Sequence, residues 1–72
     1  MTTYITDIKK RAESAGFSMA EVSREAGLDQ AQVSRWLSGR TIPLISSVEK
    51  LKLATERLIS SRIEALSGDK NG

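Results

Sequence analysis

The sequence predicts an all-α fold, a compact domain of four or five helices of which the last is long. Apolar residues recur at steps of three and four, which is the spacing of one helix face. Helix start and stop signals divide the chain, and no stretch alternates as a β-strand does. The 72 residues suffice for one domain. We expect this domain over residues 1–66 and a flexible polar tail over residues 67–72.

The first helix is predicted over residues 3–15. Ile5, Ile8 and Ala12 lie at helical spacing and therefore share one face, which should turn toward the core. Gly16 follows, and glycine readily adopts the left-handed conformation that often ends a helix.

The second helix is predicted to begin at a capping box. In Ser18-Met19-Ala20-Glu21, the serine hydroxyl and the glutamate carboxylate each satisfy a backbone amide that has no partner within the helix. Ala26-Gly27 should end this helix after about two turns. So short a helix is marginal alone, and packing must hold it.

The third helix is predicted to follow after a turn of only a few residues. Asp29 can cap its first amides, and a carboxylate is favoured at the positive end of the helix dipole. The helix should continue to Leu37 and stop at Ser38-Gly39. Its inward-facing side chains should be Val33, Trp36 and Leu37.

The fourth helix is predicted over residues 47–66, about 30 Å at a rise of about 1.5 Å per residue. Ser46-Ser47-Val48-Glu49 has the pattern of a second capping box, and neither Gly nor Pro follows until Gly68. One apolar face is formed by Val48, Leu51, Ala54, Leu58 and Leu66. The stripe formed by Ile59, Ile63 and Leu66 extends past what the core needs, and we expect it to be a dimer interface.

Composition excludes several kinds of site. The chain has no Cys and no His, so we expect no disulfide, no metal and no cofactor. No apolar run is long enough for a membrane span, and the first residues lack a secretory pattern, so we expect a cytoplasmic protein. The net charge of +2 permits nucleic-acid binding. Between Gln30 and Ser47 the only charged residues are Arg35 and Arg40, so phosphates could approach this acid-free stretch most easily.

The second and third helices form the informative unit, over about residues 18–38. They are joined by Ala26-Gly27-Leu28-Asp29, and a turn this short that contains Gly sets two helices at about 90–120°. In that arrangement the second helix of the pair can enter the major groove of DNA while the first crosses the backbone.

This segment resembles the helix-turn-helix of the Cro and lambda-repressor type, the XRE family. The resemblance is close over residues 17–43 and looser over residues 3–58. It is carried by Ser18-Met19-Ala20-Glu21-Val22, Gly27, Val33-Ser34-Arg35-Trp36, Gly39-Arg40 and Pro43. It implies a lambda-repressor-like domain, from a phage or a bacterium, that binds double-stranded DNA.

The resemblance assigns base reading to the outward positions of the third helix. In the family, the first outward positions and one position a turn later contact base edges. Here these are Gln30, Ala31 and Arg35, with Gln32 and Ser34 as neighbours. Glutamine can present a donor and an acceptor to adenine, and arginine can donate two parallel hydrogen bonds to guanine. The alternative for the glutamines and the arginine is that they are ordinary solvated side chains.

The resemblance places phosphate contacts at the start of the second helix and in the loop after the third. The corresponding groups are Ser18, the amide of Met19, Arg40 and Thr41. A helix N-terminus already binds anions through its backbone amides. Family members often carry glutamine where this chain has Met19, which puts one side-chain contact in doubt.

Two further features have competing interpretations. Trp36 could stack on bases, but its helical spacing from Val33 favours a packed core position. The cluster Lys9-Lys10-Arg11 could attract DNA, but an exposed face of the first helix is the simpler account.

The leading interpretation is a sequence-specific regulator, a small Cro-like repressor that binds a palindromic operator as a homodimer with half-sites about 34–36 Å apart. Antitoxins and restriction-system control proteins use the same fold and are the nearest alternatives. A protein-interaction module would carry apolar side chains on the outer face of the third helix, which is polar here. An enzyme is the weakest alternative, because the chain lacks His, Cys and a phosphate-binding Gly-rich loop, and no small-molecule substrate is evident.

Overall fold

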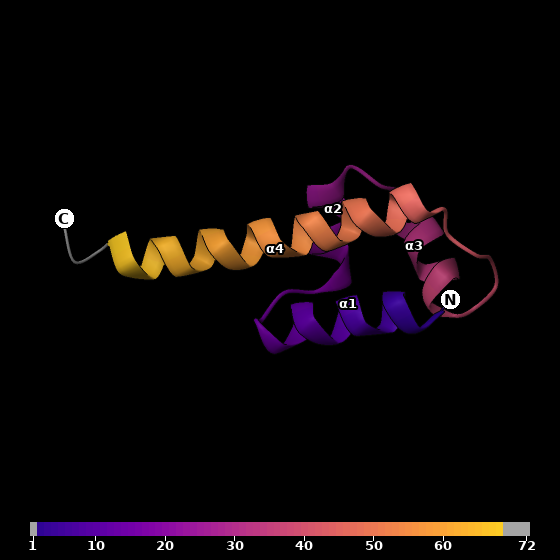
Figure 1. The fold of residues 1–72 in the computed structure, drawn as a ribbon, viewed down its shortest axis with the longest axis horizontal. Coiled ribbons are helices and arrows are strands. Elements are labelled where there is room, and N and C mark those ends of the chain that lie inside the picture. The colour runs from indigo at the N-terminus through magenta and orange to yellow at the C-terminus, as the bar shows by residue number, and fades with distance from the viewer. Residues whose placement is uncertain (1, 69–72) are drawn as a thin grey trace.

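A computed structural model of the protein describes residues 2–68, with the side chains of residues 4–66. Four helices follow one another in these residues: α1 (Thr2–Ser14), α2 (Met19–Ala26), α3 (Gln30–Leu37) and α4 (Ile45–Gly68). In Figure 1, α1 runs along the first part of α4, and α4 extends well beyond the other helices. The molecule is therefore elongated, with extents of 46 × 20 × 18 Å. The all-α prediction with a long last helix is confirmed.

The local signals at α2 and α3 act as predicted. The Ser18 hydroxyl accepts the amide of Glu21 at 3.2 Å, and the Ser18 amide donates to the Glu21 carboxylate at 2.9 Å. Gly27 ends α2 with φ of 72°, in the left-handed region. The carboxylate of Asp29 accepts the amide of Ala31 at 3.2 Å and caps α3. The predicted capping box and both caps are confirmed.

Acid should remove part of the stability of the fold through this capping box. The pKa of the Glu21 carboxyl is held below its ordinary value of 4.5, first of all by the hydrogen bond from the Ser18 backbone amide. A depressed folded-state pKa stabilises the fold above the unfolded pKa, and the contribution is lost as pH falls through the folded value. Glu21→Gln keeps an acceptor, so we expect lower stability at pH 7 and a flatter stability curve below about pH 4.5. Urea midpoints at several pH values measure this, and identical pH dependence in both proteins would contradict it.

The start of α4 differs from the prediction. Ser46 was expected to cap a helix beginning at Ser47, but α4 begins at Ile45. The carbonyl of Leu44 accepts the amide of Ser47 at 3.0 Å, so Leu44 holds the capping position. The capping box predicted at residues 46–49 is therefore wrong, because its serine lies inside the first turn. The helix also continues to Gly68, two residues further than predicted, and residues 69–72 of the predicted tail lie outside the described residues.

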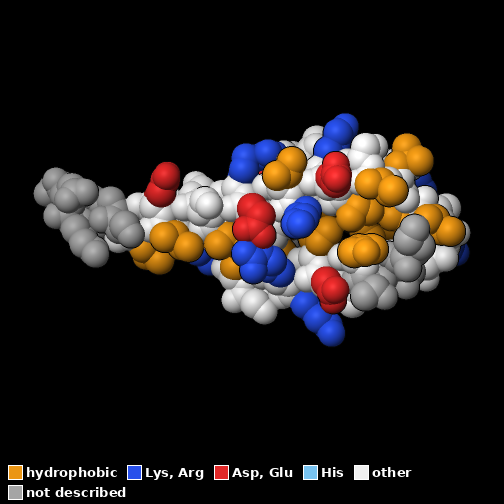
Figure 2. Space-filling view, in the orientation of Figure 1, with side chains coloured by type: hydrophobic (Ala, Val, Ile, Leu, Met, Phe, Trp, Pro, Cys, Tyr) orange, Lys and Arg blue, Asp and Glu red, His pale blue; other side chains and the backbone are white. Residues whose placement is uncertain are grey.

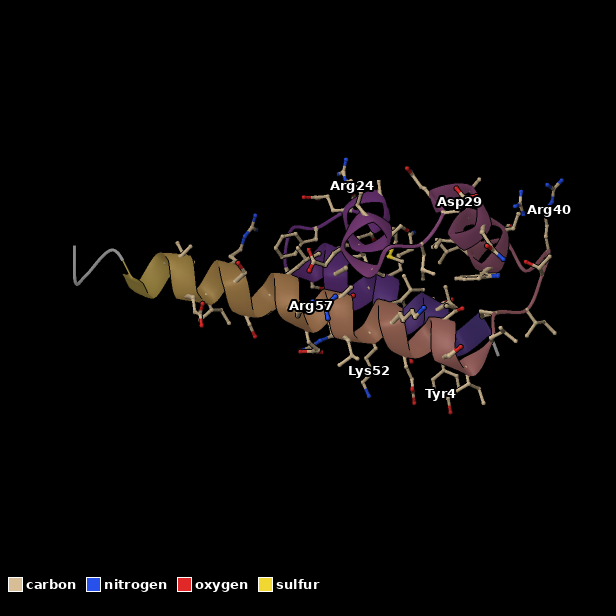
Figure 3. All side chains as sticks on the ribbon, turned by 90° about the horizontal axis from the view of Figure 1, so that it is seen from above. Tyr4, Arg24, Asp29, Arg40, Lys52 and Arg57 are labelled. Carbon is tan, nitrogen blue, oxygen red and sulfur yellow. The ribbon has the colours of Figure 1, made fainter. Side chains whose placement is uncertain are left out.

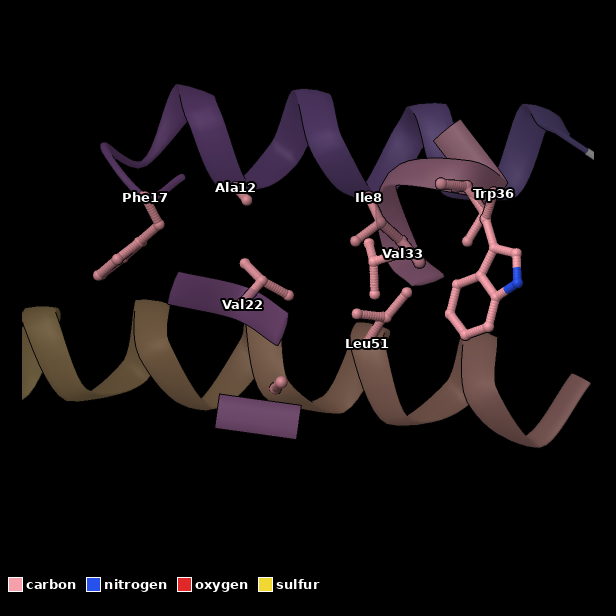
Figure 4. Packing of buried hydrophobic residues seen from close by; sticks show 9 residues of the cluster. Ile8, Ala12, Phe17, Val22, Val33, Trp36 and Leu51 are labelled. Atoms are coloured by element: carbon pink, nitrogen blue, oxygen red, sulfur yellow. The ribbon is translucent and has the colours of Figure 1, made fainter. Parts of the chain in front are cut away.

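A small apolar core lies between α4 and the other three helices. Figure 4 shows side chains from all four helices meeting in this cluster. Trp36 is only 3% exposed, which confirms the core position and excludes a base-stacking platform at this residue. The buried members are Ile5, Ile8, Ala12, Phe17, Val22, Val33, Trp36, Leu51 and Ala54.

Two ion pairs join α4 to α1 and α2. Arg11 donates from Nε and Nη2 to the Glu56 carboxylate at 2.7 and 2.9 Å, and Arg57 donates from Nε to Glu25 at 3.0 Å. All four side chains are substantially exposed, and exposed pairs contribute only about 0–1 kcal/mol. The pairs therefore orient the helices more than they stabilise them. Arg11 is engaged within the fold.

Arg62 marks the point at which α4 leaves the body of the domain. Its guanidinium donates to the carbonyl of Ala15 at 2.8 Å and lies 4.5 Å from the ring centroid of Phe17. Beyond it, the described side chains of residues 63–66 are all exposed, including Ile63 at 58% and Leu66 at 69%. The last turns of α4 thus carry apolar side chains into solvent.

Candidate nucleic-acid interface

The outer face of α3 is accessible along its whole length. All five residues predicted to read bases are exposed: Gln30, Ala31, Gln32, Ser34 and Arg35. The two α3 residues of the core face the opposite way. This division follows from helical spacing, because residues three apart lie on one side of the helix. The structure therefore leaves all the predicted base-reading side chains open to solvent, with Ala31, Ser34 and Arg35 on the side of α3 away from the core and the two glutamines at its flanks.

Both ends of α3 are capped by hydrogen bonds. At the end of α3, the Ser38 hydroxyl donates to the carbonyl of Arg35 at 3.1 Å. Gly39 has φ of 80°, and this left-handed residue lets the amide of Arg40 donate back to the Arg35 carbonyl at 2.9 Å. The cap therefore sets the direction in which the chain carries Arg40 and Thr41 away from α3.

The α2 and α3 side of the molecule carries exposed cations. Figure 3 shows Arg24, Asp29 and Arg40 on this side, away from α1 and α4. The ion pairs among the described residues involve neither Arg24 nor Arg35 nor Arg40. The carboxylate of Asp29, between the two helices, is engaged in capping α3.

Arg24 is a candidate phosphate contact that the sequence reasoning missed. It is exposed in the last turn of α2, beside the buried Val22 and Ser23. Because Val22 and Ser23 both face the core, the next residue of this short helix faces outward. The exposure of Arg24 could therefore have been predicted from helical spacing. Its position on the same side of the molecule as Arg40 depends on how the helices pack together, and helical spacing alone does not give that.

The predicted phosphate contacts fall into two groups of different character. Arg40 and Thr41 are exposed and lie in the stretch without acids. Ser18 is also exposed, but its hydroxyl donates to the Glu21 carboxylate at 3.3 Å, so a phosphate there would lie beside a like charge. The side chain of Met19 packs partly against the core, which leaves its amide as the group available to an anion. The charges therefore favour phosphate binding at Arg40 and Thr41 over phosphate binding at Ser18.

Two other kinds of site are absent from the part of the chain that the structure describes. That part contains no cluster of His, Cys, Asp and Glu able to hold a metal ion. None of its helices has the length and apolar character needed to cross a membrane.

Comparison with known proteins agrees with the geometry. A helix-turn-helix family model matches residues 8–54, which is 47 of the 72 residues and includes α2, α3 and the turn between them. No curated protein and no solved structure matches the chain. The matched segment also covers most of the residues that build the core. The chain belongs to the XRE-type helix-turn-helix family of Cro and lambda repressor, and its fold is that of DNA-binding transcription regulators.

Proposed function

We propose that this protein is a sequence-specific regulator that reads double-stranded DNA by placing α3 in the major groove. The observation that supports it best is the exposure of Gln30 and Arg35 on α3, whose core residues Val33 and Trp36 are buried. The major groove is about 12 Å wide and an α-helix with its side chains about 10–12 Å across, so the helix fits. An anisotropy titration of labelled duplex at two salt concentrations tests the binding, because phosphate contacts make the affinity fall with salt.

Each exposed side chain of α3 has a role that its chemistry permits. Gln30 would bond the edge of adenine, Arg35 would donate two parallel hydrogen bonds to guanine, and Ala31 would contact a thymine methyl group. Gln32 and Ser34 flank these contacts and can bond neighbouring edges. Each bidentate contact discriminates by about 1–3 kcal/mol.

Phosphate contacts would position α3 without reading sequence. Arg40 and Thr41 lie just after α3, and Arg24 lies on the same side at the end of α2. The amide of Met19 and the hydroxyl of Ser18 would add contacts at the start of α2. These groups supply affinity and register, while the α3 side chains supply specificity.

We further propose a homodimer that binds a palindromic operator, with the end of α4 as the interface. One α3 spans only a few base pairs, and a second copy doubles the sequence that is read. Ile63 and Leu66 are largely exposed, and Ile59 is half-buried beside the end of α1. A helix end without packing is marginal in water, and a second α4 laid against this stripe would cover its apolar side chains.

The length of α4 fits the spacing of such a dimer. Figure 4 shows Val33 of α3 facing Leu51 of α4 within the core. Leu51 lies 12 positions before Ile63, which is about 18 Å along the helix at about 1.5 Å per residue. Two α4 helices paired antiparallel about Ile63 would set the α3 helices about 36 Å apart along that direction. Half-sites separated by one turn of DNA lie about 34–36 Å apart.

The direction in which the apolar stripe of Ile59, Ile63 and Leu66 faces supports the same antiparallel dimer. Figure 2 shows hydrophobic side chains along the lower edge of the extended part of α4. A partner helix placed there would be related by a two-fold axis that runs along the line of sight. Such an axis keeps α2 and α3 of both copies on one side of the dimer, where one duplex can meet both. Bound across a promoter, the dimer would act as a repressor by excluding polymerase.

Ile63→Glu should dissociate the dimer. The substitution places two carboxylates at the centre of the proposed antiparallel contact, where like charges repel and lose water. Sedimentation velocity should show a smaller species than the unmodified protein forms, and affinity for a palindromic duplex should fall to that for a single half-site. Ser61→Glu is the matched control, because Ser61 is exposed and lies on the other side of α4. Equal oligomeric states for the two variants would contradict the interface.

A further inference from the structure

A second apolar surface lies at the N-terminal end of α4. A groove of about 510 Å³ opens between the beginning of α1 and the beginning of α4. Ile42 and Leu44, in the loop that leads into α4, are 71% and 72% exposed. Figure 2 shows hydrophobic side chains gathered at this end of the molecule. The residues that line the groove are Tyr4, Pro43, Ile45, Val48, Glu49 and Lys52.

This groove faces away from the surface proposed to meet DNA. Figure 3 shows Tyr4 and Lys52 pointing to the side opposite to Arg24, Asp29 and Arg40. DNA bound at α3 would leave the groove uncovered. The groove is also remote from the stripe at the end of α4, so the proposed dimer leaves it open too. An occupant of this groove would therefore be something other than DNA and other than the partner at the α4 stripe.

We propose that this groove face binds the same face of a second copy of the chain, taken from another dimer. The charges at the groove are self-complementary, because Glu49 and Lys52 lie one helical turn apart on the same side of α4. In a two-fold contact, residue i of one copy meets residue j of the other and the reverse. Glu49 of each copy then lies opposite Lys52 of the other, with Tyr4 and Ile45 forming the apolar centre.

The consequence of this pairing is a bridge between two DNA segments. Because the groove and the α3 surface face opposite ways, two copies joined at their grooves direct their α3 surfaces away from each other. Dimers joined in this way form a tetramer or a longer chain with DNA surfaces on both sides. The bridge rests on the proposed DNA binding, while the groove contact itself does not.

Charge reversal tests the contact without DNA. Glu49→Lys and Lys52→Glu should each abolish species larger than a dimer in sedimentation velocity, because like charges then face each other. An equimolar mixture of the two variants should restore those species, because the two lysines in the groove of one variant then meet the two glutamates in the groove of the other. Lys50→Glu, an exposed change of the same charge outside the groove, should behave as the unmodified protein does. Absence of larger species in the unmodified protein, or a mixture no better than either variant alone, would overturn the self-pairing.

A bridging assay then tests the consequence. Bead-bound duplex carrying the preferred site should retain a second, free labelled duplex when the protein is present, and neither single variant should support this retention. The affinity for a single duplex, measured by gel shift, should be unchanged in both variants, because the groove lies away from α3. If the unmodified protein does not bind DNA at all, the proposed function is contradicted, but the sedimentation test of the groove contact is unaffected. Retention by the single variants equal to that of the unmodified protein would overturn the bridge.

Discussion

Arg35→Ala is expected to reduce affinity for the preferred DNA site by about 1–3 kcal/mol, which is roughly 5- to 150-fold. The guanidinium is exposed on the outer face of α3 and is free of the ion pairs that occupy Arg11 and Arg57. Its two parallel donors match guanine, and truncation leaves the base edge without its partner. Random duplex should lose much less affinity, because only a general positive charge has been removed there.

Fluorescence anisotropy with both duplexes at one salt concentration measures the difference. Lys50→Ala is the control, since Lys50 is an exposed cation on α4 outside the α2 and α3 surface. Its effect should be small and similar on both duplexes. If Arg35→Ala weakens the preferred site and random DNA by the same factor, Arg35 contacts phosphate and does not read a base.

Leu51→Ala is expected to cause a large loss of stability, about 2–5 kcal/mol. Leu51 has no exposed surface and lies in the cluster where α4 meets the other helices. The substitution removes buried methyl groups and leaves a cavity. Domains are commonly stable by only about 5–15 kcal/mol, and one this small has few contacts to spare. A large fraction of the variant should therefore be unfolded at 37 °C.

Leu53→Ala is the matched control for this loss. Leu53 is on the same helix and undergoes the same chemical change, but it is 58% exposed. Urea unfolding followed by circular dichroism should show a large shift of the midpoint for Leu51→Ala and a small one for Leu53→Ala. Similar shifts for the two variants would contradict the position of the core on α4.

The parts of the fold that depend on neighbouring residues could be predicted from the sequence. The capping box at Ser18 and Glu21 joins groups three positions apart, and its geometry follows from helical spacing. The same spacing placed Trp36 in the core and Arg35 outside it. The surface of α3 was predictable for this reason, because a single helix determines which of its residues share a face.

The start of α4 shows where a local pattern fails. Residues 46–49 have the form Ser-x-x-Glu, but the chain enters the helix directly after the buried Pro43, with Leu44 as the cap. A capping pattern states which side chains could bond the first amides. It does not determine the residue at which the helix begins, and α4 begins at Ile45, two residues before the predicted start at Ser47.

Contacts between residues far apart in the chain could not be predicted from the sequence. The pair between Arg11 and Glu56 joins residues 45 positions apart, and no spacing rule connects them. The groove lined by Tyr4 and Ile45 exists only because α1 lies beside the start of α4. Ile42 and its neighbours have the sequence of an ordinary loop, and only the assembled helices leave them on one exposed surface.

Selection of preferred sites from a pool of random duplexes tests most directly whether the outer face of α3 reads base sequence. The unmodified protein should enrich an inverted repeat whose half-sites are centred about one helical turn apart. Positions facing α3 should be the most restricted, and Gln30→Ala should relax one of them. Recovery of duplexes with no enriched sequence after repeated rounds would contradict the assignment of α3 as the reading surface.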